Sequence, residues 1–316
     1  MNLKNDMFWY KYQPKSLNTI ILLPRIKELI KDGLSANMIF YSDTPGTGKT
    51  TLARILCKDT DNIEFNASEE TGVDILRDQL KTHCKTLNPF FGKESQKTIF
   101  LDEFDGVSAE YQKAMKGFSD RYQHVRFILT TNYIQKIDDK ILSRFIKVDF
   151  DPKTKEETDY LQTMYFKYLK AIATKNKIAI TDEEIRKMIM LSFPDLRQAT
   201  QRLQEVFMTN NTDQFKNLSA SGYDDIFQFV MDGKNNIEEN YSFVANNFID
   251  NPLELMKALG RPLFSRIQNI DNENLIKQGA TLIKLQKSYN AEYTSTIDPV
   301  LHLISYLTDI KEILKK

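Results

Sequence analysis

The sequence predicts an α/β domain with a parallel sheet, followed by a small three-helix domain and an all-helical C-terminal domain. In residues 1–150, short apolar runs alternate with helical patterns, as in successive βα units. After that point the apolar residues recur with the helical period, and no strand-like alternation follows residue 216. The length of 316 residues exceeds the about 100–200 residues of a usual domain. We therefore expect three domains, at 1–150, 151–212 and 213–316.

Five apolar runs are the predicted strands of the sheet. Each of the first four is followed by polar or glycine-containing residues, where a strand is expected to end. The fifth is followed by Asp151 and Pro152, which separate it from the next helical pattern. The five runs are 38–41, 63–65, 98–101, 125–129 and 146–150.

Three helices are expected after the sheet, before a polar linker. Thr154 with Glu157, and Thr181 with Glu184, form capping-box patterns that start the first two. The third begins near Pro194, since proline is favoured in the first turn of a helix. Apolar residues of the first helix recur at i, i+3 and i+4 spacing, which is typical of a face packed in a core. They are Leu161, Met164, Tyr165, Tyr168, Leu169 and Ile172.

Composition and charge exclude several classes of protein. Hydrophobic residues make up 41% and charged residues 27% of the chain, so it is not intrinsically disordered. Lys and Arg together number 43, as do Asp and Glu, so binding to a nucleic acid requires a local basic patch. Cys57 and Cys84 are far apart in sequence and the three histidines are scattered, which indicates no zinc site.

The sequence also contains no segment typical of secretion or membrane insertion. The first residues lack the apolar region of a signal peptide. No apolar run approaches the about 18 residues of a membrane span. Two cysteines do not form a disulfide scaffold, which favours a reducing compartment. We expect a soluble, cytoplasmic protein without a membrane partner.

The segment 41–51 has the pattern of a phosphate-binding loop, or P-loop. It follows a predicted strand and precedes a helical pattern, although Asp43 stands where the full pattern begins with Gly. Its glycines allow backbone N–H groups to turn toward phosphate oxygens. Lys49 is expected to reach the β- and γ-phosphates, and the Thr50 hydroxyl to ligate Mg²⁺. The predicted nucleotide contacts in this loop are Pro45, Gly46, Thr47, Gly48, Lys49, Thr50 and Thr51.

Two adjacent acids follow the predicted strand at 98–101. Asp102 is expected to hold Mg²⁺, directly or through water, and Glu103 to polarise the attacking water. Adjacent acids after a strand are common in loops. A second nucleotide element at a plausible distance after the phosphate-binding loop favours the Walker B interpretation, with Thr50 and Asp102 as metal ligands.

Two more polar residues are candidates for the hydrolysis step. Asn132 ends the next predicted strand, where an amide can orient the attacking water or touch the γ-phosphate. Arg144 follows a predicted helical turn, where it can stabilise a transferring phosphate only on another subunit's nucleotide. Taken singly, each is better explained as an ordinary solvated residue, so only the whole set points to function.

The set resembles the ATPase subunits of sliding-clamp loaders, in the AAA+ superfamily, and four further segments carry that resemblance. Residues 66–74 are similar to the family's Asn-Ala-Ser-Asp-Glu-Arg-Gly-Ile-Asp segment. Residues 11–14 resemble its Lys-Tyr-Arg-Pro segment at the adenine pocket, with Gln13 in place of Arg. Residues 143–145 resemble its Ser-Arg-Cys motif, with Phe145 in place of Cys. Residues 193–199 resemble its sensor-2 helix.

The resemblance implies roles for individual residues. Tyr12 would line the adenine pocket, Arg197 would contact the γ-phosphate of the same subunit's ATP, and Arg144 would act in trans as an arginine finger. Phe104 departs from the family's usual Asp-Glu-Ala-Asp, but both acids before it are unchanged. Within the family, the short chain and the segment 20–24 look most like the large ATPase subunit of T4-type phage loaders. Archaeal and eukaryotic small subunits are close alternatives.

The implied activity is ATP-driven loading of a ring-shaped sliding clamp onto primer–template DNA, by an ATPase that DNA and clamp stimulate. Copies of the chain would join a non-identical subunit in a pentameric assembly, with the C-terminal domain acting as an oligomerisation collar. The assembly would be cytoplasmic, in the cytoplasm of a host if the protein is phage-encoded. One alternative is another AAA+ DNA-remodelling ATPase, such as a branch-migration helicase or a replication initiator. The other is a non-hydrolysing structural subunit, which the intact Lys49, Asp102 and Glu103 oppose.

Four basic residues are candidates for contacts with DNA phosphates. Arg77 and Lys81 lie one turn apart on a predicted helix, and Lys113 and Lys116 lie on the helix after the Walker B acids. A loader needs contacts that do not depend on sequence, because primers vary. A solvated helix face is an equally good interpretation of each. Since no predicted domain is strongly basic, DNA affinity is expected to depend on ATP and on assembly.

Overall fold

The computed structural model describes residues 7–67, 73–86 and 96–212 and part of the C-terminal region: 242, 281–282, 284–285, 287–289, 291–292 and 298–315. The chain divides into two compact units, Met1–Ile178 with Ser192–Met208 and Ala179–Leu191 with Thr209–Lys316. The three domain ranges expected from the sequence remain a prediction.

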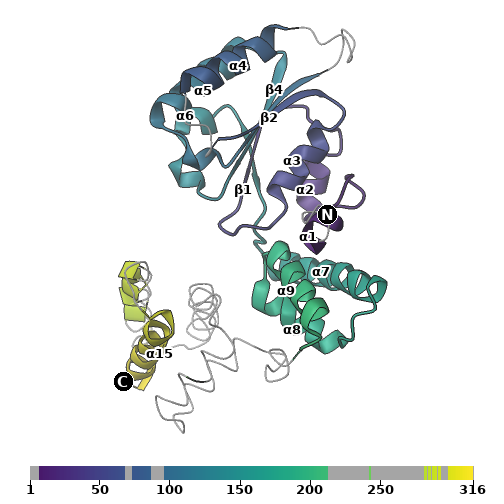
Figure 1. Ribbon diagram of the computed structural model, residues 1–316. Coiled ribbons are helices and arrows are strands. Elements are labelled where there is room, and N and C mark those ends of the chain that lie inside the picture. The colour runs from purple at the N-terminus through teal and green to yellow at the C-terminus, as the bar shows by residue number, and fades with distance from the viewer. Residues whose placement is uncertain are drawn as a thin grey trace. The chain divides into compact units, whose positions relative to one another are not determined.

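A five-stranded sheet with strand order β2-β3-β4-β1-β5 forms the centre of the first unit (Figure 1). All neighbouring strands are parallel, as the alternation of strand and helix patterns predicts. Every predicted strand run overlaps an observed strand, although β5 ends one residue earlier than the predicted run 146–150. The strands are β1 Met38–Tyr41, β2 Asp61–Asn66, β3 Lys97–Asp102, β4 Val125–Thr131 and β5 Ile146–Asp149.

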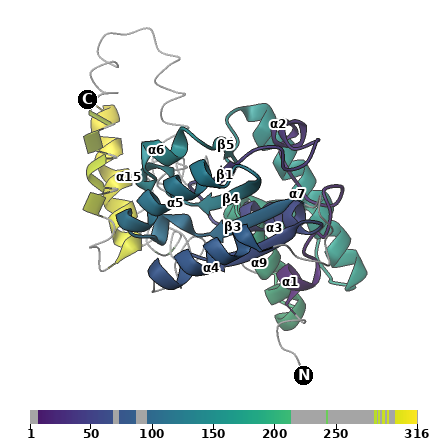
Figure 2. The same cartoon turned by 90° about the horizontal axis from the view of Figure 1, so that it is seen from above.

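Helices cover both faces of the sheet because alternate strand residues point to opposite sides. The register aligns Phe65, Leu101, Leu129 and Ile39 in one row across four strands. This row belongs to a buried core shared with α4 Val73–Lys85, α5 Ala109–Arg121 and α6 Asp139–Leu142. Helices α2 Pro24–Leu29 and α3 Lys49–Cys57 lie on the other side of the sheet (Figures 1 and 2).

The helices expected after the sheet are present as α7 Lys155–Lys175, α8 Asp182–Ser192 and α9 Leu196–Thr209. Thr154 is the N-cap of α7, and its hydroxyl accepts a hydrogen bond from the N–H of Glu157 at 3.2 Å. Thr181 and Glu184 form a reciprocal capping box, with N–H to side-chain distances of 2.8 and 3.2 Å. Local capping therefore sets where α7 and α8 begin.

The short N-terminal helix α1 Phe8–Lys11 is attached to α7 and α9. The N–H of Phe8 donates to Gln204 Oε1 of α9 at 2.8 Å. The phenol of Tyr168 in α7 donates to the carbonyl of Tyr12 at 3.1 Å. The rings of Phe8 and Phe207 lie 5.3 Å apart, centroid to centroid. These contacts fix the start of the chain beside the helices that follow the sheet.

The described C-terminal residues are helical, as the sequence pattern predicts, except Asp298. In α15 Pro299–Lys315 the apolar side chains of one face are buried. Tyr289 packs against this helix, and its hydroxyl donates to Asp309 Oδ2 at 2.7 Å. Within the described part of the chain, every helix is too short or too polar to span a lipid bilayer. The role of this region as an oligomerisation collar remains a prediction.

Candidate nucleotide-binding site

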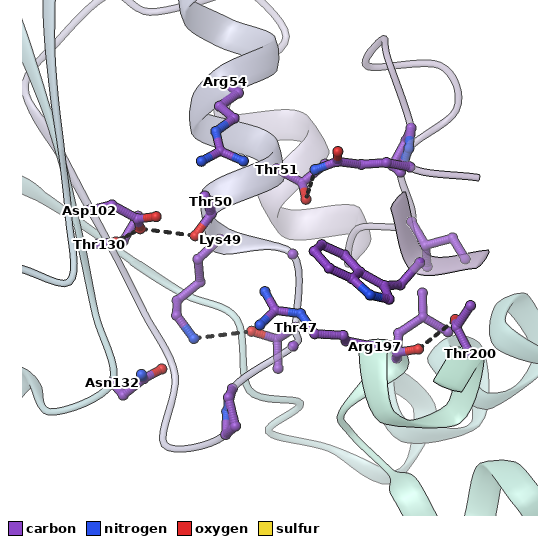
Figure 3. A pocket seen from close by; sticks show the side chains of 18 of the residues that line it. Thr47, Lys49, Thr50, Thr51, Arg54, Asp102, Thr130, Asn132, Arg197 and Thr200 are labelled. Carbon is purple, nitrogen blue, oxygen red and sulfur yellow. Dashed lines mark hydrogen bonds between the residues drawn. The ribbon is translucent and has the colours of Figure 1, made fainter. Parts of the chain in front are cut away.

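A pocket in the first unit lies between the carboxyl ends of the central strands and the helices α7 and α9 (Figure 3). We call its two sides the core wall and the helical wall. The core wall consists of residues 45–51, Arg54, Asp102, Glu103 and 130–132. The helical wall consists of Trp9, Gln13, Pro14, Ile21, Tyr165, Tyr168, Leu196, Arg197 and Thr200.

The loop between β1 and α3 owes its shape to two glycines. Gly46 and Gly48 have φ angles of 71° and 99°, a region that side-chain-bearing residues rarely adopt. Gly48 is the N-cap of α3, so the first N–H groups of this helix lack partners within the helix. Helix starts of this kind attract anions, because the N–H groups and the helix dipole both favour negative charge.

Lys49 is buried beneath this loop. Its ammonium group donates to Ser42 Oγ at 3.0 Å, to the carbonyl of Thr44 at 3.1 Å and to Thr47 Oγ1 at 3.4 Å. Burial lowers the pKa of Lys49 to about 8. These acceptors are neutral, whereas a phosphate would offer charged oxygens to the same ammonium group.

Asp102, at the end of β3, is held by two hydroxyl groups (Figure 3). The hydroxyl of Thr50 donates to Asp102 Oδ1 at 2.9 Å, and the hydroxyl of Thr130 in β4 donates to the same oxygen. Both residues predicted to ligate the metal are thus adjacent. Thr130, which the sequence analysis did not single out, fixes the carboxylate from the neighbouring strand.

Glu103 and Asn132 line the pocket beside this cluster. Glu103 has a φ of 55°, and its N–H donates to Thr130 Oγ1 at 3.0 Å. The N–H of Asn132 donates to Asp105 Oδ1 at 3.2 Å, which ties β4 to the turn after β3. The Oδ1 of Asn132 is buried and finds no hydrogen-bond partner within the described residues. An unsatisfied polar atom of this kind suits a polar ligand in the pocket.

Asp195, just before the helical-wall residues Leu196 and Arg197, lies against the phosphate-binding loop. Asp195 caps α9, accepting from the N–H of Gln198 at 2.9 Å, and burial raises the pKa of Asp195. A Cβ atom on Gly46 would lie 1.7 Å from Asp195 Oδ1, so a larger residue here would have to displace the Asp195 carboxylate. Arg197, two residues after Asp195, lines the pocket (Figure 3). The start of α9 therefore brings Arg197 to the phosphate end.

Tyr12 is not among the pocket-lining residues, although its neighbours Gln13 and Pro14 are. Its hydroxyl lies 2.8 Å from Asn176 Nδ2, which donates to it. Gln13 Nε2 instead reaches the loop and donates to Thr51 Oγ1 at 3.3 Å. The role of Tyr12 at the base remains a prediction, and Gln13, which replaces the arginine of the clamp-loader motif, provides a direct link to the loop.

Arg144 follows α6 and is not part of the pocket lining. Its guanidinium pairs with the carboxylate of Asp120 in α5, with N–O distances of 2.7 and 3.2 Å. This hydrogen-bonded pairing lowers the pKa of Asp120. A partly exposed arginine away from its own chain's pocket is the arrangement that action on another subunit's nucleotide requires.

Three of the four candidate DNA contacts are described. Lys81 lies on α4, where its ammonium group pairs with Asp78 at 3.1 Å. Lys113, which is exposed, and Lys116 lie on α5, the neighbouring helix on the same face of the sheet (Figures 1 and 2). The side chain of Arg77 and residues 68–72 of the clamp-loader-like segment lie outside the described residues.

Three pocket residues escaped the sequence analysis for different reasons. Thr130 follows the aligned pair Leu101 and Leu129, so the strand register would have revealed it as the neighbour of Asp102. Arg54 forms a two-pronged ion pair with Glu64 and has no motif of its own. Trp9 reaches the pocket only because α1 is attached to the later helices.

A family model matches the domain that contains the sheet, and several known proteins are similar to a longer part of the chain. Residues 38–152 match the ATPase family associated with various cellular activities (AAA). Replication factor C small subunit 2 of Pyrobaculum arsenaticum is 32% identical over 213 residues, 63% of this chain and 63% of that protein. The replication factor C small subunit of Sulfurisphaera tokodaii is 33% identical over 217 residues, 65% of this chain and 63% of that protein.

The chain is a homologue of the replication factor C small subunits. The predicted resemblance to clamp-loader ATPase subunits of the replication factor C small-subunit type is confirmed, and the preference for the T4-type phage subunit remains a prediction. The chain spans about 63% of the length of those curated relatives, so the activity of the whole relatives is a proposal for this chain.

A solved structure supports the fold class. The chain resembles the RuvB Holliday junction branch migration motor of Thermotoga maritima with a TM-score of 0.51 and 17% identity, over 79% of this chain and 85% of that one. At this identity the likeness concerns the fold alone. It agrees with the predicted parallel sheet and phosphate-binding loop, while the helical lid and the collar remain predictions.

Proposed function

We propose that this chain is an ATP-hydrolysing subunit that drives the loading of a ring-shaped sliding clamp onto primer–template DNA. The core wall carries the proposal, because Lys49, Asp102 and Asn132 come from three neighbouring parallel strands or the loops that follow them. The homology to replication factor C small subunits supports DNA replication as the process. The polar atoms of the core wall suit a nucleoside triphosphate with Mg²⁺.

Thr50 and Asp102 provide a site that fits Mg²⁺. Their side-chain oxygens lie 2.9 Å apart, and hydroxyl and carboxylate oxygens are the ligands that this cation prefers. A Mg²⁺ held by these two residues would supply positive charge that offsets the charge developing on the phosphates. Thr130 holds the carboxylate of Asp102 in position, and Lys49 supplies a second positive charge beside the phosphates.

Glu103 and Asn132 are the residues we assign to water activation. Glu103 follows Asp102 directly, and its left-handed backbone turns the chain at the strand end, so the two acids serve different positions. The carboxylate of Glu103 accepts a proton from the attacking water. The unsatisfied Oδ1 of Asn132 accepts a hydrogen bond that orients the same water or the phosphate group.

Arg144 is the residue that we expect a neighbouring copy to supply. In the single chain its guanidinium pairs with Asp120. Because exposed ion pairs of this kind contribute little to stability, the larger charge of a triphosphate can displace the carboxylate. Each ATP then links two subunits, and hydrolysis removes the link. This exchange explains how ATP would hold copies together and how clamp release would follow hydrolysis.

The DNA-binding part of the proposal rests on helices α4 and α5. Lys81, Lys113 and Lys116 lie there, and Arg77 belongs to the same helix α4 as Lys81. The net charge of the chain is zero, so one copy alone should bind DNA weakly. If Arg77 contacts a phosphate, Arg77→Ala should reduce the slope of log K against log salt concentration by about one. An unchanged slope would count against this patch.

The function is tested by measuring ATP hydrolysis by the protein alone, with primer–template DNA, with a sliding clamp, and with both. We expect the largest stimulation with both together, and no activity from Lys49→Ala under any condition. Stimulation by DNA alone, with no further effect of the clamp, would favour a DNA-remodelling ATPase. ATP binding with no hydrolysis under all four conditions would favour a structural subunit.

A further inference from the structure

Trp9 and Arg197 form a contact on the helical wall that the proposed mechanism does not use. The guanidinium carbon of Arg197 lies 5.5 Å from the centre of the Trp9 indole ring, in cation–π range. Both residues line the pocket. Arg197 is otherwise an exposed side chain with several rotatable bonds.

The two residues are held on the same wall by other contacts. Trp9 belongs to α1, which Gln204 and Phe207 of α9 fix through the backbone and ring of Phe8. Arg197 belongs to the first turn of α9. The indole therefore keeps a constant position relative to α9 and can restrain the arginine without depending on the core wall.

The first turn of α9 lies at the phosphate end of the pocket. Asp195 is packed so closely against Gly46 that a Cβ on this glycine would collide with the carboxylate. Arg197 also influences Lys49 electrostatically, lowering the pKa of that lysine in addition to the larger effect of burial. A guanidinium kept here lies in the pocket that the phosphate-binding loop also lines, as the predicted contact of Arg197 with the γ-phosphate requires.

We propose that Trp9 is a positioning residue for Arg197: its indole holds the guanidinium on the pocket wall before nucleotide binds, so that the arginine meets the terminal phosphate without first being ordered. The inference rests on the proposed function in taking ATP as the ligand, and on the γ-phosphate contact of Arg197 that the clamp-loader resemblance implies. An unrestrained arginine would lose rotamer freedom on binding ATP, whereas an arginine already held loses less. ADP lacks the phosphate that Arg197 contacts, so the restraint favours ATP over ADP.

Trp9 also has a polar atom that accords with a place in the pocket. Its Nε1 is buried and has no hydrogen-bond partner in the described part of the chain. A buried indole N–H usually finds an acceptor. If a bound base supplied the acceptor, Trp9 would contribute equally to the affinities for ATP and ADP, and this outcome separates a base contact from the positioning role.

The test compares affinities for ADP and for a non-hydrolysable ATP analogue, measured by calorimetry, in Trp9→Leu, Trp9→Phe, Arg197→Gln and the double variant Trp9→Leu/Arg197→Gln. We expect Trp9→Leu to weaken binding of the analogue about two- to fivefold more than it weakens binding of ADP. Trp9→Phe should retain most of the preference, since it keeps an aromatic face. Trp9→Leu should have no further effect once Arg197 is replaced.

Three results would overturn the positioning role: equal loss of affinity for both nucleotides in Trp9→Leu, no loss for either, or additive effects in the double variant. Trp9 is the only tryptophan of the chain. Its intrinsic fluorescence therefore gives a second measurement, which does not require that a Trp9 variant folds. Arg197→Gln should change the emission of the nucleotide-free protein, and an unchanged spectrum would contradict the contact.

The outcome can be separated from that of the proposed function. A protein with the expected nucleotide preferences but no joint stimulation by clamp and DNA would overturn clamp loading alone. A protein that clamp and DNA stimulate, but in which Trp9→Leu leaves both affinities unchanged, would overturn the positioning role alone.

Discussion

The two walls of the pocket differ in how their polar groups are arranged. On the core wall, Lys49, Thr50, Asp102 and Thr130 form hydrogen bonds within the wall, so each group is already fixed in place. The helical wall consists mainly of aromatic and apolar side chains, with Arg197 held by an indole face. The core wall is therefore suited to stabilising a transition state, whereas the helical wall is suited to binding and recognition.

Arg144 belongs to neither wall and gives the largest expected effect. Arg144→Ala should leave ATP affinity unchanged and lower DNA- and clamp-stimulated turnover by about 10³–10⁵, the range known for arginine fingers. Steady-state ATPase assays and calorimetry measure the two quantities. Normal stimulated turnover in this variant would contradict the assignment.

A mixing experiment separates action in trans from action within one chain. The Arg144→Ala variant keeps an intact nucleotide site but lacks the arginine proposed to act in trans. The Lys49→Ala variant keeps this arginine but has a defective nucleotide site. Mixed assemblies should recover part of the activity that neither variant shows alone. Asp120→Asn serves as the control, because it frees Arg144 without removing it and should not reduce turnover.

Glu103→Gln tests whether the core wall acts on turnover rather than on binding. Loss of a general base should lower turnover at saturating ATP by about 10²–10⁴. ATP affinity should stay within about twofold, since the amide keeps the shape of the side chain. Glu110→Gln, on the exposed side of α5, is the matched control and should change neither turnover nor ATP affinity. A large rise in the dissociation constant for ATP would show that Glu103 contributes to binding instead.

Thr130→Val tests whether the hydroxyl of Thr130 positions the metal ligand Asp102. Valine has the same shape but neither donates to Asp102 nor accepts from the N–H of Glu103. Groups that orient a metal ligand typically account for about 10–100-fold in metal affinity. The Mg²⁺ concentration for half-maximal ATPase should rise accordingly, and Thr130→Ser should restore it. Thr98→Val provides a control, because the buried hydroxyl of Thr98 has no partner among the described residues.

The sequence was sufficient to predict the sheet and the core wall, because both depend on local patterns. The strand runs, the glycines of the loop and the two acids at 102–103 are each recognisable from neighbouring residues alone. Parallel neighbours then bring the strand ends together without further information. The core wall is thus a consequence of elements that each carry their own signal.

The helical wall was only partly predictable, because its geometry depends on contacts between distant segments. Trp9 and Arg197 are 188 positions apart, and nothing near either residue indicates that their side chains touch. The placement of Tyr12 outside the pocket lining likewise follows from how α1 is attached to α7 and α9. Arg197 itself was found through family resemblance and not through any local pattern of charge.

Gly46 gives the smallest expected effect and tests the point where the two walls meet. Gly46→Ala introduces two costs: a left-handed backbone, at roughly 1–2 kcal/mol, and a collision with Asp195. Gly48→Ala introduces only the first, because among the described residues no atom of a non-neighbouring residue lies within 4 Å of the position that its Cβ would take. In the nucleotide-free protein, both substitutions should therefore lower the midpoint temperature of thermal unfolding, and Gly46→Ala should lower it more.

In an Asp195→Ala background, Gly46→Ala and Gly48→Ala should destabilise the protein equally, after allowance for the about 1 kcal/mol lost with the N-cap of α9. Equal destabilisation by the two alanines in the wild-type background would mean that Asp195 moves away freely, and that the helical wall is not held against the phosphate-binding loop.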